Sequence, residues 1–80
     1  MKAHVYVTLK RTVLDPQGQT IHGALKRMQY TDVEEVRQGK YFQLTLGVMQ
    51  ASDARAEVER IAREVLTNPV IEEFTYRIEE

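Results

Sequence analysis

The chain has 80 residues, of which 42% are hydrophobic and 29% are charged, and its net charge is −1. A chain of this length forms one domain, residues 1–80, and buries only about 60% of its unfolded surface, so it gains stability from association. The near-neutral charge argues against a nucleic-acid partner. There is no cysteine, and no apolar run approaches the ~20 residues that span a bilayer, so we expect a cytoplasmic protein without a membrane partner.

The N-terminal third predicts a strand followed by a helix. Residues 4–10 alternate between apolar and polar side chains, which is the pattern of a half-buried strand. Asp15 and Pro16 are typical of a helix start, because the carboxylate caps free N–H groups and proline suits the first helical position. We expect the helix over Pro16–Gln29, where apolar side chains recur at helical spacing: Ile21, Ala24, Leu25 and Met28.

Two glycines, Gly18 and Gly23, fall inside this short helix, and each costs about 1 kcal/mol relative to alanine. Either this helix is poorly formed or something comes close to its backbone. For Gly23 we expect close packing within the chain, because apolar residues follow it at once. For Gly18 two explanations stay open: a partner or second protomer docks at the helix start, or another part of this chain lies against it.

The middle of the chain predicts two further strands. Val33 and Val36 indicate a short, irregular strand over Asp32–Gln38, and Gly39 is expected to form the turn that follows it. Residues Tyr41–Val48 alternate again, with the apolar side chains of Phe42, Leu44 and Leu46 on one side.

The C-terminal part predicts a second helix and a last strand. Ser52 or Asp53 is expected to cap the helix, and the stretch Thr67-Asn68-Pro69 to end it. Residues Ile71–Glu79 then alternate as a strand. The order β-α-β-β-α-β predicts an α+β, ferredoxin-like fold, with a four-stranded antiparallel sheet and two helices on one of its faces.

The other face of such a sheet carries no helix. Alternation places two tyrosines and several threonines on it with few charges, a composition more typical of a protein contact than of a solvated surface. A plain solvated face is the alternative. We expect self-association, as a homodimer or tetramer, through these residues, beside His4: Tyr6, Thr8, Tyr41, Gln43, Thr45, Thr75 and Arg77.

No set of residues predicts catalysis, metal binding or cofactor binding. His4 and His22 fall on different elements and lack the further ligands that a metal site needs. The stretch RQGKYF (Arg37–Phe42) is similar to the Arg/Lys-Gly-aromatic motif of RNA-recognition domains. However, the next outward residue is Gln43 rather than an aromatic, and no basic stripe accompanies the motif.

Three stretches carry a resemblance to a known family: LDPQG (Leu14–Gly18), VRQGKYF (Val36–Phe42) and NPVIEEF (Asn68–Phe74). In this order and spacing the chain resembles the PurS family, the small subunit of phosphoribosylformylglycinamidine synthase. The similarity runs from about Val5 to Glu79.

The resemblance implies a non-catalytic subunit of purine biosynthesis, which bridges a glutaminase subunit and an ATP-dependent large subunit and supports ammonia transfer between them. It implies that this chain binds no cofactor, whereas ATP, Mg²⁺ and glutamine are used by the partner subunits. The alternative function is a ferredoxin-like regulatory domain that binds an effector. We expect partner docking at the helix start and hairpin: Asp15, Pro16, Gly18, Arg37, Gly39 and Lys40.

Overall fold

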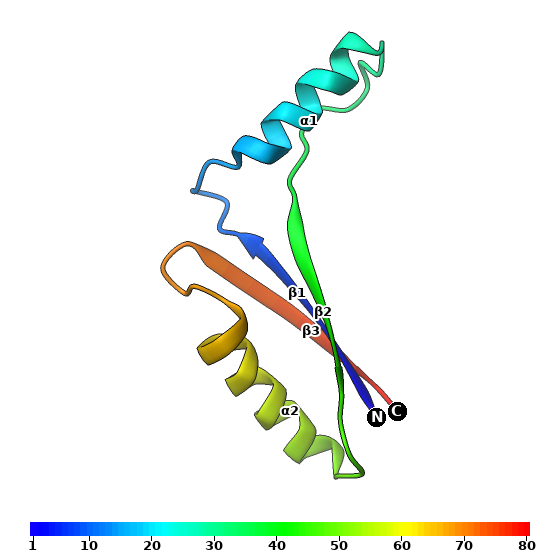
Figure 1. Cartoon of the computed structure of the whole chain (residues 1–80), viewed down its shortest axis with the longest axis vertical. Helices are drawn as coiled ribbons and strands as arrows, with labels where there is room; N and C mark the ends of the chain where they lie inside the picture. The colour runs from blue at the N-terminus through cyan, green and yellow to red at the C-terminus, as the bar shows by residue number, and fades with distance from the viewer.

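The computed structural model describes residues 1–80 as three strands and two helices, the second of which ends in a π-helical turn (Figure 1). The strands form one antiparallel sheet in the order β2-β1-β3. Along the chain the elements are β1 (Lys2–Leu9), α1 (Pro16–Arg27), β2 (Gly39–Thr45), α2 (Ala51–Ile61), η1 (Ala62–Leu66) and β3 (Glu72–Glu79).

The central strand, β1, contributes most of the buried core. Val5 lies opposite Phe42 of β2 and Tyr76 of β3, so residues of the same alternation share one face of the sheet. Ala3, Val5 and Val7 on this face are fully buried. The predicted alternation of β1 is therefore confirmed.

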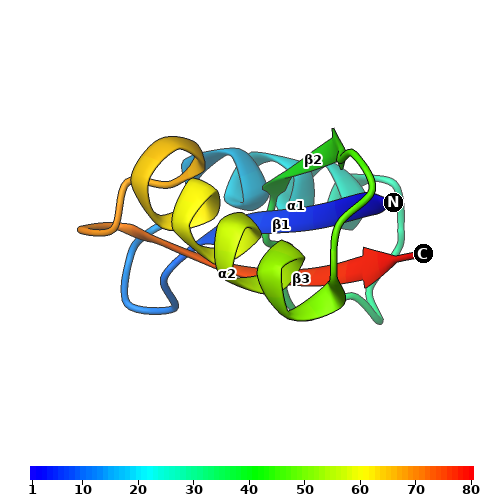
Figure 2. The ribbon, with the colours of Figure 1, turned by 90° about the horizontal axis from the view of Figure 1, so that it is seen from below.

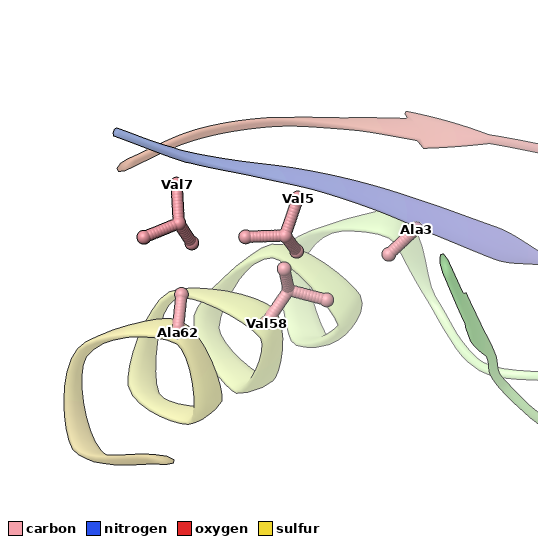
Figure 3. Packing of buried hydrophobic residues seen from close by; sticks show 5 residues of the cluster. All are labelled: Ala3, Val5, Val7, Val58 and Ala62. Carbon is pink, nitrogen blue, oxygen red and sulfur yellow. The ribbon is translucent and has the colours of Figure 1, made fainter. Parts of the chain in front are cut away.

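Helix α2 covers this face of the sheet (Figure 3). Val58 and Ala62 point toward Val5 and Val7, and all four are fully buried. Burying one valine contributes about 1.5–3 kcal/mol. Partly buried apolar side chains surround this cluster: Phe42, Leu44, Leu46, Leu66, Phe74, Tyr76 and Ile78.

The two ends of α2 differ in whether a side chain caps their free backbone groups. The helix begins at Ala51 after Gln50, which makes no side-chain cap, so the predicted cap at Ser52 or Asp53 is wrong. Both lie in the first turn, where Asp53 still interacts favourably with the helix dipole. The predicted end is confirmed: the Thr67 hydroxyl donates to the Ala62 carbonyl at 2.8 Å as the last turn widens.

Helix α1 does not lie on the sheet, which corrects the predicted two-helix layer. It stands beyond the end of the sheet (Figure 1) and makes no extensive packing contact with any strand or with α2. Seen from below, α2 lies in front of the strands and α1 behind them (Figure 2). The molecule measures 49 × 26 × 14 Å with a radius of gyration of 16.0 Å. A compact domain of this length has about 12 Å. Of the predicted apolar stripe, Ile21 and Met28 remain exposed.

The predicted strand over Asp32–Gln38 does not form, so the sheet has three strands rather than four. Gln29, with a positive φ of 75°, ends α1 and reverses the chain, and the return segment runs back beside the helix. There His22 Nε2 donates to the Val33 carbonyl at 2.7 Å. The segment thus lies against α1 and is too far from the edge of the sheet to pair with it as a fourth strand. Residues 16–38 are called the arm below.

Candidate functional site

The outgoing and returning chains of the arm meet at its base, where Asp15 holds them together. Asp15 caps α1 as predicted, since its Oδ1 accepts from the Gly18 N–H at 3.0 Å. Its other oxygen, Oδ2, accepts from the Gln38 N–H at 2.7 Å. Hydrogen bonds from Gln38 and then Gly18 favour the carboxylate and lower the pKa of Asp15. Although only 5% exposed, Asp15 is therefore stable as an anion.

Arg37 makes the reciprocal connection, from the returning chain to the outgoing one. Its Nη2 donates to the carbonyls of Lys10 and Val13, both at 3.0 Å, and lies 3.5 Å from that of Leu9. Leu9 is the last residue of β1, and the other two carbonyls lie in the loop that follows it, where the Lys10 carbonyl also accepts from the Val13 N–H at 2.8 Å. Residues 10–18 and 36–39, joined by these contacts, are called the junction below.

Glycine is required at two positions of the junction because other parts of this chain lie against the backbone there. A Cβ at Gly18 would collide with the Val36 carbonyl oxygen, so the space beside this glycine is filled by the returning chain itself. A Cβ at Gly39 would lie 2.5 Å from the Val7 carbonyl oxygen. Gly39 pairs with Thr8 as the first residue of β2, which corrects its predicted place in a turn.

Gly23 does not pack closely within the chain, contrary to the prediction. The nearest atom to a Cβ there is Nη1 of Arg27, at 3.6 Å, which is ordinary van der Waals contact.

A groove of about 430 Å³ lies between the junction and the end of the sheet. The predicted docking residues that line it are the buried Asp15 and the exposed Pro16, Gly39 and Lys40, whereas Gly18, which is buried, and Arg37, which is half-buried, do not line it. Lys40 Nζ lies 3.2 Å from Glu72 Oε2, and Glu72 Oε1 accepts from the Asn68 N–H at 2.7 Å. The bond from Asn68, followed by the one from Lys40, lowers the pKa of Glu72. The predicted docking residues therefore divide between the groove and the inside of the junction.

The second sheet face is free of helices, and the structure brings its predicted aromatic residues together. The rings of Tyr6 and Tyr41 stack with centroids 5.3 Å apart, and those of His4 and Tyr41 with centroids 5.8 Å apart. His4 Nε2 donates to Glu79 Oε2 at 3.1 Å, so in the neutral ring Nδ1 accepts from the Tyr41 hydroxyl. The full set, Tyr6, Thr8, Tyr41, Gln43, Thr45, Thr75 and Arg77, is exposed and is called the open face below.

Reasoning from the sequence missed the hydrogen bonds by which Asp15 and Arg37 join the outgoing and returning chains. Each residue was singled out, but their partners lie more than twenty residues away. No three His, Asp or Glu side chains gather as metal ligands. Neither α-helix has the length and apolar character of a membrane span.

Comparison with known proteins decides the family. Residues 2–80 match the PurS family model, described as phosphoribosylformylglycinamidine (FGAM) synthase. The chain belongs to the PurS family. The PurS subunit of FGAM synthase from Bacillus subtilis is 43% identical over 99% of this chain and 93% of its own length.

Solved PurS structures share the fold. The B. subtilis PurS structure superposes with a TM-score of 0.86 over 99% of this chain and 98% of its own. PurS from Methanocaldococcus jannaschii, a subunit of an amidotransferase of the purine biosynthetic pathway, is 33% identical with a TM-score of 0.89, covering 99% and 95% of the two chains. A chain of the PurLQS structure from Thermotoga maritima is 32% identical with a TM-score of 0.87, covering 95% and 93%.

Replacing Gly18 by alanine is expected to destabilise the protein by about 1–3 kcal/mol, because the new methyl group collides with the Val36 carbonyl and overpacks the junction. Gly23→Ala is the matched control in the same helix. It meets no close atom and is expected to stabilise α1 by about 1 kcal/mol. Urea unfolding at one protein concentration measures both. Stabilisation by Gly18→Ala would contradict the internal role of this glycine.

Asp15 is expected to make stability depend on acid pH. Its pKa is lowered from 3.8 in the folded state, so the unfolded state binds the proton first and stability falls as pH drops from about 4 through the lowered value. Thermal unfolding between pH 2 and 6 measures this loss. In Asp15→Asn the loss should be smaller, since no carboxylate remains to be protonated. An unchanged acid profile would show that Asp15 is not a source of it.

Proposed function

We propose that this chain is a non-catalytic assembly subunit of FGAM synthase that bridges a glutaminase subunit and an ATP-dependent large subunit in the cytoplasm. The observation that carries the proposal is the near full-length match to the PurS chain of the T. maritima PurLQS structure. ATP, Mg²⁺ and glutamine act in the partner subunits and not on this chain. Its role is to hold the other two so that ammonia released from glutamine reaches the large subunit.

The shape of one chain supports a homodimer as the unit of assembly. The arm leaves the apolar residues Ile21 and Met28 exposed, while the sheet has only α2 on its apolar face and no strand beyond β2. In one copy, therefore, α1 has no sheet to pack on, and the apolar face of the sheet is covered by one helix only. In a two-fold dimer the arm of each chain lies on the sheet of the other. This one contact covers both the apolar residues of the arm and the uncovered part of the sheet.

The open face is proposed as a second self-association surface, which pairs two such dimers into a tetramer. The stacked rings of Tyr6 and Tyr41 supply apolar area that loses little conformational entropy on burial. His4 and Glu79 are already hydrogen-bonded to neighbours within the face, which lowers the cost of removing water from them.

The groove beside the junction is proposed as the edge that docks another subunit. Pro16, Gly39 and Lys40 are exposed along it, and Arg37 lies behind them. Lys40 supplies a positive charge at its rim, partly neutralised by Glu72.

The bridging role predicts a specific dependence of turnover on this chain. Synthesis of FGAM by the large and glutaminase subunits is measured with and without the chain, once with glutamine and once with ammonium as the nitrogen source. We expect glutamine-driven turnover to need the chain and ammonia-driven turnover to proceed without it, because only the former requires ammonia to pass between subunits. Equal rates with and without the chain from both sources would contradict bridging.

The open face predicts a change of mass on substitution. Thr75 lies on the edge strand β3, opposite Tyr6 of the central strand, so Thr75→Lys places a long charged side chain between pairing dimers. Sedimentation is expected to show the tetramer reduced to a dimer. Val48→Lys, at a fully exposed loop residue, is the control and should leave the mass unchanged. A tetramer that persists in Thr75→Lys would exclude the open face as the pairing surface.

A further inference from the structure

The direction of the arm depends on a small part of the molecule. Helix α1 makes no extensive packing contact with the sheet or α2, so no apolar layer fixes its angle. Apart from the covalent chain, the arm is connected to the sheet by the junction. Two of the three stretches that carry the family resemblance, Leu14–Gly18 and Val36–Phe42, meet there.

The junction is built to resist bending. The Asp15 carboxylate accepts one N–H from each of the two chains. Arg37, which lies on the returning chain, donates to carbonyls of the outgoing chain. Hydrogen bonds with one charged partner are about twice as strong as neutral ones. The Val36 carbonyl lies so close to Gly18 that no side chain fits between the returning chain and the first turn of the helix. At the surface, Arg11 and Glu35 add an exposed ion pair between the same two segments, at 3.1 Å.

Without these contacts the arm has the reach to close on its own sheet. Six residues, Lys10–Asp15, separate β1 from α1, and at ~3.3 Å per residue they extend to roughly 20 Å. A closed chain would cover its own apolar face and would no longer need a second copy. Hinges of this kind commonly decide between closed monomers and exchanged dimers.

We propose that Asp15 and Arg37 are positioning residues for assembly, which hold the arm open so that it packs on a second copy of this chain. The inference rests on the proposed homodimer with exchanged arms. It gives these two residues an internal task, in place of direct contact with another subunit, and it explains why a carboxylate and a guanidinium are placed where α1 has no apolar support.

The test compares junction variants with matched variants outside the arm and the junction. Asp15→Ala and Arg37→Met remove the charged hydrogen-bonding groups. Glu64→Ala and Arg63→Met remove a carboxylate and a guanidinium at exposed residues of η1, outside the arm, and serve as controls. The dimer dissociation constant is measured by sedimentation over a dilution series. We expect it to rise at least tenfold in each junction variant and to stay within twofold in the controls.

A second measurement reports the angle between the arm and the rest of the chain. A general loss of stability would not change this angle in the folded protein. Lys26→Cys on α1 and Arg60→Cys on α2 introduce spin labels into a chain that has no cysteine, and labelled chains are diluted into unlabelled ones. The wild-type junction is expected to give one narrow distance distribution. Asp15→Ala and Arg37→Met are expected to give a broad distribution or a shorter distance, while hydrogen exchange of β1 stays slow.

The outcomes separate this inference from the function on which it rests. A wild-type chain that stays monomeric at all concentrations would overturn the homodimer, whatever the junction does. A wild-type dimer whose dissociation constant and label distance are unchanged in both junction variants would overturn the positioning role alone. If Asp15→Ala does not fold, Asp15→Asn and Arg37→Lys, which keep part of each contact, take its place. A dissociation constant within twofold of wild type in both would likewise overturn it.

Discussion

The attachment of α1 beyond the end of the sheet is the constraint on which the rest of the structure depends. Because the helix leaves the sheet at that point, one chain encloses a fully buried cluster of only five small and branched residues beneath α2. The apolar residues of the arm stay in contact with solvent. A chain of this length is marginal even when compact, so an extended one has a strong physical reason to associate. The extended fold thus favours the assembly that the proposed function calls for.

The two helices are held in place by different interactions: α2 by apolar packing, and α1 by polar groups. At the core, Val58 and Val5 place the second helix on the sheet through burial. At the junction, the buried Asp15 and the half-buried Arg37 place the first helix through hydrogen bonds to backbone groups that no strand satisfies. Such contacts are directional, whereas burial is not, so they suit a helix that must hold an angle without touching a layer of side chains.

The prediction of the fold from sequence succeeded where the signal was local. Alternation in β1 identified the buried face, and Asp15 with Pro16 marked the first residue of α1. It failed for Asp32–Gln38, where Val33 and Val36 have the spacing of a strand, but the Val33 carbonyl and the Gln38 N–H are hydrogen-bonded to the side chains of His22 and Asp15. It also failed for Gly23, because helix propensity says that a glycine is costly without saying what lies beside it.

The sequence by itself determined the type and order of most elements, the composition of the open face and, through three short stretches in the right order, the family. These features depend on periods of two or 3.6 residues and on side chains that act on their own neighbours. Only the tertiary structure decided that the sheet has three strands, that α1 stands apart, and that Gly18 faces Val36 while Asp15 binds Gln38. Those contacts join residues about twenty positions apart, and their formation depends on the path of the intervening chain, which no local pattern specifies.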